Sequence, residues 1–233
     1  MKGDVFVHCE TTEGALDERA FGLISEGRRL ASTLGVDLHA VTVGYTDMPA
    51  LRALGHRSVR KVYKATISED QPSCEVEAAT LEAIVSKHKP SLILFAATPT
   101  SAEVSARLAA RLGRGLVSGC VDVRVTESGD RVAVKPLHGG TAHAIVTWTT
   151  PPPFLASFQP EVLEVEEATG RTDAVVEEFR LDPPRSRVKV EGYFRVEADK
   201  LDLSEADIVF GVGRGLGSIE NMQTVKEAAS LIH

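Results

Sequence analysis

Apolar and polar residues alternate in two repeating patterns along the first half of the chain. Short apolar runs rich in β-branched residues predict buried strands, which we place at residues 4–10, 36–43, 58–66 and 91–97. Longer stretches with apolar residues three or four positions apart predict helices, which we place at residues 13–35, 48–55, 73–89 and 101–113. This alternation predicts an α/β fold, with a mostly parallel sheet flanked by helices on both faces.

The pattern changes after Gly115. Strand-like runs between residues 120 and 148 are separated by Ser-Gly-Asp and Gly-Gly, so we expect hairpins that add antiparallel strands to the main sheet. One more apolar strand is expected at residues 154–160. Residues 161–203 are charged and weakly patterned, with strand-like pieces near 175–181 and 187–190. We therefore expect three parts, which are an amino-terminal α/β domain (1–166), an extended strand and linker (167–203), and an incomplete second domain (204–233).

The last part predicts a strand, a glycine-rich turn and a helix. The strand is expected at residues 208–210, and Ser218 is expected to cap a helix whose apolar face carries Met222, Val225, Ala229 and Ile232. The turn contains Gly213, Arg214, Gly215 and Gly217, but it misses the third glycine position of the dinucleotide-binding motif. Free N–H groups at such a helix start attract phosphate, and Arg214 adds a positive charge. The alternative is that the glycines only let a strand turn sharply into a helix.

Composition narrows the possible functions. The 233 residues carry a net charge of −7 with a pI near 5.5, which gives no basic surface for nucleic acid or an anionic membrane. We expect no membrane insertion because no apolar run approaches the roughly 18–20 residues needed to span a bilayer. The amino terminus lacks a secretory pattern, and the three cysteines are too widely spaced for a disulfide framework or a metal cluster. These features are typical of a cytoplasmic protein.

Candidate nucleophiles and metal ligands all have a simpler interpretation. His8 and Cys9 lie in a predicted buried strand and are best interpreted as a satisfied core pair. His138 and His143 flank a turn but lack a third metal ligand nearby. The sequence around Ser118 lacks the turn that exposes a serine nucleophile. We therefore expect no catalytic residue and no metal site.

Other polar and aromatic residues are interpreted in the same way. Thr98, Thr100 and Ser101 favour simple helix capping over binding of an anion. Trp148 and Phe154 favour the core or a subunit interface over a stack on a flavin. The acidic side chains of the predicted helices are interpreted as solvated surface, and they are Asp17, Glu18, Glu75, Glu77 and Glu82.

Four stretches together resemble the α subunit of electron-transfer flavoproteins, in the same order and spacing. They are "HKPSLILFAATPTSAEVSARLAARLGRGLVSG" (88–119), "KPLHGGTAHA" (135–144), "FLASFQPEVLE" (154–164) and "DIVFGVGRGLGSIENMQTVKEAA" (207–229). The resemblance covers nearly the whole chain and implies a nucleotide-hydrolase-like (Rossmann-like) domain followed by the beginning of a second Rossmann-like, FAD-binding domain. The chain departs from the family pattern at Ser101–Glu103, Gly119, His138 and Thr141, which suggests a divergent branch.

The resemblance implies a heterodimer with a β subunit and one FAD, which the carboxy-terminal domain of the α subunit mainly holds. AMP or a second FAD is expected on the β subunit. Acyl-CoA dehydrogenase-type flavoenzymes of fatty acid oxidation are the implied electron donors, and a downstream acceptor takes the electrons. The arginine of the Gly-Arg-Gly turn lies by the FAD phosphates in the family and corresponds to Arg214. We expect Gly213, Gly215 and Ser218 to line the same cofactor site.

The family's later flavin-domain motifs, such as a Gly-Gln-Thr-Gly loop and a Gln-His segment, do not occur in this sequence. We therefore expect either the amino-terminal part of a longer α subunit or a split subunit, and we do not expect this chain alone to retain FAD. A second hypothesis is a module that binds the β subunit and no flavin. A third is a nucleotide-binding α/β enzyme, which the absence of a glycine-rich phosphate loop after the first strand disfavours.

Overall fold

The computed structural model describes residues 3–12, 14–44, 47–67, 73–167, 170–180, 186–188, 191 and 208–231. The chain divides into two compact units, residues 1–190 and residues 191–233, and each is described by itself. The boundaries expected from the sequence, near residues 166 and 203, stay predictions.

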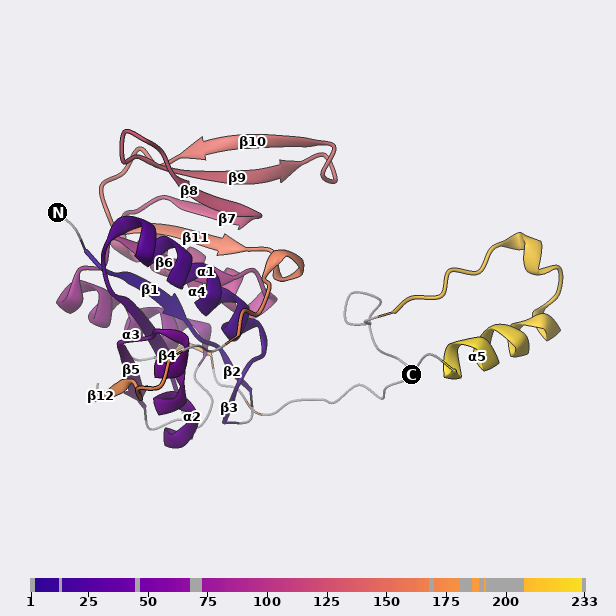
Figure 1. Ribbon diagram of the computed structural model, residues 1–233, viewed down its shortest axis with the longest axis horizontal. Helices are drawn as coiled ribbons and strands as arrows, with labels where there is room; N and C mark the ends of the chain where they lie inside the picture. The colour runs from indigo at the N-terminus through magenta and orange to yellow at the C-terminus, as the bar shows by residue number, and fades with distance from the viewer. Residues whose placement is uncertain are drawn as a thin grey trace. The chain divides into compact units, whose positions relative to one another are not determined.

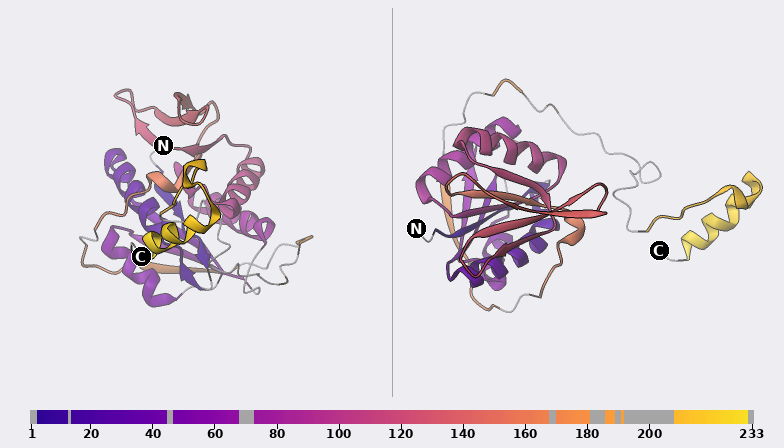
Figure 2. Two further views of the ribbon diagram at one scale, coloured as in Figure 1. Left: turned by 90° about the vertical axis from the view of Figure 1, so that its right-hand side faces the viewer. Right: turned by 90° about the horizontal axis from the view of Figure 1, so that it is seen from above.

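The first unit is built on a seven-stranded, fully parallel sheet with the strand order β12-β5-β4-β1-β6-β11-β7 (Figure 1). Its strands are β1 (Val5–His8), β4 (Leu38–Val43), β5 (Lys61–Thr66), β6 (Leu92–Ala96), β7 (Leu116–Cys120), β11 (Phe154–Phe158) and β12 (Val175–Arg180). Four helices cover it, and they are α1 (Arg19–Leu34), α2 (Met48–Ala53), α3 (Cys74–His88) and α4 (Pro99–Leu112). Figure 2 shows helices on both faces of the sheet, which confirms the predicted α/β fold.

Side chains of β1 alternate between two apolar layers. Val5 and Val7 pack with α1 and α2, while Phe6 packs with α3 and α4. All three side chains are fully or almost fully buried, because helices cover both faces of a parallel sheet. Asp47, Ser73 and Thr98 cap the starts of α2, α3 and α4, and Gly35 and Gly113 end α1 and α4 in the left-handed conformation.

The first helix begins later than the sequence predicts. Residues 11–16 form a small antiparallel hairpin, β2 (Thr11–Thr12) with β3 (Ala15–Leu16), and α1 starts only at Arg19. Gly14 has a φ of 83°, a conformation that glycine adopts without strain. Leu16, which falls within the helix predicted at residues 13–35, therefore lies in the hairpin.

The predicted hairpins are present, but they do not extend the main sheet. They form a separate three-stranded antiparallel sheet of β8 (Asp122–Val125), β9 (Arg131–Leu137) and β10 (Ala142–Thr147), in the order β10-β9-β8. The edge strand next to β11 in the main sheet is instead β7, which was not predicted from the sequence. Gly119 has a φ of 61°, and the pairing of β7 with β11 shifts register near it, so the chain leaves the main sheet there.

The chain then crosses from β11 to the opposite edge of the main sheet, where β12 pairs with β5 along its whole length. This confirms the strand predicted near residues 175–181. The described part of the connection, residues 163–167 and 170–174, is called the crossing segment below. Its Ala174 N–H donates to the Arg52 carbonyl at 2.8 Å, and its Gly170 N–H donates to the His56 carbonyl at 2.8 Å. The second strand-like piece is described only at residues 187 and 188, which are not in a strand.

The described part of the second unit contains two short 3-10 turns, Arg214–Leu216 and Ile219–Asn221, followed by helix α5 (Met222–Ser230). The predicted strand at residues 208–210 is wrong, because these residues pair with no other described segment. Of the predicted helix face, Met222, Val225 and Ala229 are the half-buried residues of α5, and Ile232 lies outside the described residues. No described residue of this unit is fully buried.

Candidate functional site

The four residues expected to bind the cofactor lie within the glycine-rich turn of the second unit. Backbone bonds close the turn, with the Leu216 N–H donating to the Gly213 carbonyl at 3.1 Å and the Gly217 N–H to the Arg214 carbonyl at 3.2 Å. Arg214 is exposed and forms no ion pair with the described residues. A Cβ atom added at Gly213 or Gly215 would meet no described atom within 4 Å, so packing among these residues does not require either glycine.

Ser218 does not cap a helix through its side chain, contrary to the sequence prediction. Its backbone is extended, and a 3-10 turn separates it from α5. The turn is instead braced by Asn221, whose side-chain amide donates to the Leu216 carbonyl at 2.7 Å. The hydroxyl of Ser218 therefore has no capping bond and remains open to another partner.

A second polar group lies in the first unit, where the carboxyl ends of β1 and β6 meet. Ligands of open α/β sheets bind at such a point, because the chain leaves the two neighbouring strands in opposite directions. Here the Thr98 hydroxyl accepts the Ser101 N–H at 3.1 Å and donates to the Glu10 carboxylate at 2.6 Å. The start of α4 is thus capped by Thr98 and faced by a carboxylate of the chain itself. The interpretation of this segment as a helix cap is confirmed.

Close to this helix start, the buried His8 side chain forms hydrogen bonds to one residue of α3 and one residue of α4. His8 Nε2 lies 2.7 Å from Glu77 Oε1, and His8 Nδ1 lies 3.2 Å from the Ser101 hydroxyl. Burial lowers the pKa of His8, but the hydrogen bond and charge of Glu77, aided by Glu10, outweigh burial and raise this pKa above its ordinary value. The order Ser-His-Glu matches a nucleophile, a base and an orienting acid. Ser101 is completely buried, however, so it presents no nucleophile to a substrate.

Glu77 corrects one interpretation of the sequence. It was assigned to the solvated face of its helix, but only 8% of its surface is exposed. The missed signal is its spacing, because Glu77 precedes the buried Leu81 by four residues and the buried Ile84 by seven. A carboxylate on the apolar face of a helix needs a buried partner, and His8 on the adjacent strand provides it.

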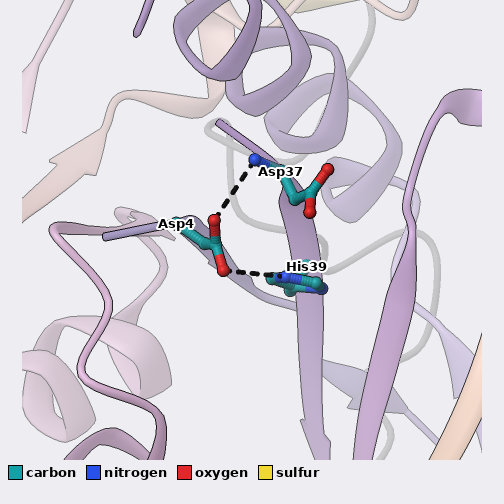
Figure 3. Close-up of side chains that lie close together, drawn as sticks. All are labelled: Asp4, Asp37 and His39. Carbon is teal, nitrogen blue, oxygen red and sulfur yellow. Dashed lines mark hydrogen bonds and ion pairs between the residues drawn. The ribbon is translucent and has the colours of Figure 1, made fainter. Parts of the chain in front are cut away.

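A third group lies at the opposite, amino-terminal ends of β1 and β4 (Figure 3). The close-up shows Asp4 reaching the Asp37 N–H with one oxygen, at 3.3 Å, and His39 Nε2 with the other, at 3.2 Å. Asp4, Asp37 and His39 each offer a ligand atom, and these atoms lie within 4.8 Å of one another. Arg60 already pairs with the Asp37 carboxylate at 2.5 Å. The two carboxylates are therefore paired within the chain, whereas His39 Nδ1 is buried and has no hydrogen-bond partner among the described residues. The group joins the beginnings of two core strands.

The remaining candidates do not form a reactive centre among the described residues. Burial raises the pKa of the Cys9 and Cys120 thiols to about 12, which keeps both protonated and unreactive. His138 and His143 are exposed and belong to no described group with metal-ligand spacing. Trp148 and Phe154 pack against each other with ring centres 5.4 Å apart, in the partly buried margin of the core.

None of the described helices has both the length and the apolar character needed to cross a bilayer.

Comparison with known proteins identifies the family. The family model of the electron transfer flavoprotein domain matches residues 5–184. Protein FixB of Clostridium saccharobutylicum is 31% identical over 232 residues, which are 98% of this chain and 69% of the relative. The electron transfer flavoprotein subunit alpha of Clostridium acetobutylicum is 29% identical over 234 residues, with 98% and 70% covered. The lactate dehydrogenase (NAD(+),ferredoxin) subunit LctC of Acetobacterium woodii is 29% identical over 235 residues, with 98% and 55% covered. The chain therefore belongs to the electron transfer flavoprotein family, as a member similar to its alpha subunits.

Proposed function

We propose that the chain works as the α subunit of a heterodimeric, FAD-containing electron carrier between flavin dehydrogenases and a downstream acceptor. One observation carries the proposal, which is the similarity of 98% of the chain, glycine-rich turn included, to a protein named electron transfer flavoprotein subunit alpha. Acyl-CoA dehydrogenase-type flavoenzymes of fatty acid oxidation are the proposed donors. Such a carrier needs no general acid, base or nucleophile of its own, in keeping with the buried Ser101.

The residues of the glycine-rich turn fit the phosphate end of FAD. Arg214 offers an exposed guanidinium that can donate charge-assisted hydrogen bonds to a diphosphate. Gly213 and Gly215 leave room for a ligand to approach the backbone closely, and the Ser218 hydroxyl is open to a further bond. When bound, FAD supplies the electron-transfer chemistry, and the proposed part of these four residues is to hold its phosphates.

The first unit is proposed as the docking body for the β subunit, on which we place AMP or a second FAD. Its seven-stranded sheet and two apolar layers form a complete core without the second unit. A rigid body of this kind suits a subunit that positions cofactors by holding a partner.

A second candidate is a module that binds the β subunit and no flavin. It is favoured by the second unit, whose described residues are all exposed or half-buried. Ile208, Val209, Phe210 and Val212 are each at least 41% exposed. A flavin site needs a more enclosed arrangement than these residues provide by themselves.

Co-purification with the cognate β subunit separates the two candidates. The chain and a tagged β subunit would be produced together, and the flavin absorbance of the purified complex would be compared with its protein content. A complex with bound FAD that dehydrogenases can reduce supports the electron carrier. A stable complex that holds no flavin on this chain supports the docking module. Failure of the two chains to associate contradicts both.

A further inference from the structure

An open cleft lies on one side of the first unit, and it shares no residue with the proposed cofactor site. It has a volume of about 600 Å³, within the range of small-molecule sites. The β2–β3 hairpin and the first turn of α1 form one wall, and α2 with the short 3-10 helix after it (Leu54–Arg57) forms the other. These two connections follow the carboxyl ends of neighbouring strands, β1 and β4.

The middle of the cleft is apolar and its two ends carry opposite charges. Leu16, Phe21 and Ala53 line the middle with exposed or half-buried apolar surface, and the buried Leu54 lies behind them. Asp47 precedes α2 at one end, and Arg57 closes the 3-10 helix at the other. Nine helical residues lie between Asp47 and Arg57, so their backbones are roughly 15 Å apart along the helix axis.

Arg57 is held in place without being neutralised by a described carboxylate. Its guanidinium lies 4.9 Å from the centre of the Phe21 ring and donates to the Glu166 carbonyl at 2.6 Å. The nearby Asp173 pairs with His56 at 3.3 Å instead. A half-buried guanidinium with a fixed orientation donates strong, charge-assisted hydrogen bonds to a carboxylate or a similar anion.

The other end of the cleft offers much less to a charged ligand. Asp47 is exposed, and its carboxylate already accepts the Ala50 N–H as the cap of α2. A cation paired with an exposed carboxylate gains little in water. The Asp47 charge instead repels an anionic group, so an elongated ligand with one anionic end is oriented with that end at Arg57.

We propose that this cleft binds an amphipathic anion, a small molecule with an extended apolar body and one carboxylate-type group. The carboxylate pairs with Arg57, and the apolar body lies along Leu16, Phe21 and Ala53. The site consists of residues of the first unit alone, so the proposal stands apart from flavin binding and electron transfer.

Decanoate and its uncharged counterpart decanol are suitable probes. Backbone amide chemical shifts of the full chain would be followed during titration with each. We expect saturable decanoate binding with the largest shifts at residues 14–16, 21 and 50–57, and much weaker binding of decanol. Absence of saturable binding, equal binding of decanol, or shifts confined to residues 208–231 would overturn the proposal.

Four variants locate the ligand. Ala53→Trp fills the cleft and should abolish binding, while the matched Ala53→Ser should leave it unchanged, since Ala53 is exposed and tolerates either side chain. Arg57→Gln should weaken decanoate binding at least about tenfold and leave decanol unchanged. Arg57→Lys should restore most of the affinity. Melting temperatures show whether each variant is folded, and decanoate affinity unchanged in folded Ala53→Trp contradicts the proposed location.

Discussion

His8 Nε2 on β1 lies 2.7 Å from Glu77 Oε1 on α3, and only 2% and 8% of the two residues are exposed. The contact places an ionisable pair inside an apolar layer. Removal of one partner leaves the other buried without compensation, which is far more costly than the loss of a surface ion pair.

Replacement of Glu77 should therefore destabilise the first unit strongly. We expect Glu77→Gln to lower the free energy of unfolding by about 3 kcal/mol, measured by urea denaturation. Glu82→Gln is the matched control, because Glu82 lies on the same helix and pairs with Arg111 at a partly exposed position. If the two substitutions lower the free energy of unfolding equally, the buried His8–Glu77 pair contributes no more to stability than the partly exposed Glu82–Arg111 pair.

The same pair should make stability depend on pH. The folded-state pKa of His8 is raised above 6.5, so the folded protein binds this proton more tightly than the unfolded chain. This contribution is fully present below pH 6.5 and is lost as the pH rises through the raised folded value. Urea denaturation at a series of pH values above 6.5 should show that the free energy of unfolding of the original protein decreases as the pH rises. The decrease should be smaller in His8→Gln. A decline of the same size in both proteins would assign it to other groups.

His39 should produce the opposite pH dependence. Burial lowers its pKa below 6.5, although the charge and hydrogen bond of Asp4 partly oppose this effect. A lowered folded pKa means that stability is complete above pH 6.5 and is lost as the pH falls toward the folded value. We expect His39→Asn to reduce the acid sensitivity of unfolding. If His39→Asn loses as much unfolding free energy at acidic pH as the original protein does, the assignment to His39 is contradicted.

Gly55 should be intolerant of any side chain. A Cβ atom there would lie 2.2 Å from both the Ala174 nitrogen and the Thr172 oxygen, which are backbone atoms of the crossing segment. We expect Gly55→Ala to destabilise the first unit by about 1–3 kcal/mol and to speed amide exchange in β12. Gly211→Ala is the control, because a Cβ atom there meets no described atom within 4 Å. If amide exchange in β12 is no faster in Gly55→Ala, the crossing segment shifts to accommodate the added methyl group.

Substitution of Arg214 should weaken FAD binding without weakening the binding of the β subunit. In the proposed heterodimer, Arg214→Gln removes a charge-assisted hydrogen bond and should weaken FAD binding by roughly tenfold or more. Arg214→Lys should retain part of the affinity. The measurement is the FAD content of the purified complex after dialysis. FAD retention equal to that of the original protein would remove Arg214 from the proposed site.

The sequence predicted most elements that local pattern alone determines. The strand around Val5–His8 and the end of α1 at Gly35 follow from apolar runs and a glycine stop, and the structure has both. β7 was missed because Ser118 and Gly119 interrupt its apolar run, and its place depends on pairing with β11, distant in sequence. Glu77 was misplaced because a carboxylate is normally exposed. Its burial depends on His8, and no local pattern reveals that contact.

The crossing segment also has a consequence for synthesis of the protein on the ribosome. β5 pairs with β4 early, but its other edge stays unpaired until β12 has been made more than a hundred residues later. An unpaired strand edge readily accepts strands from other chains. During synthesis, one edge of β5 in the first unit therefore remains unpaired until residues 175–180 have been made. These residues then pair with β5 as β12 and complete the sheet.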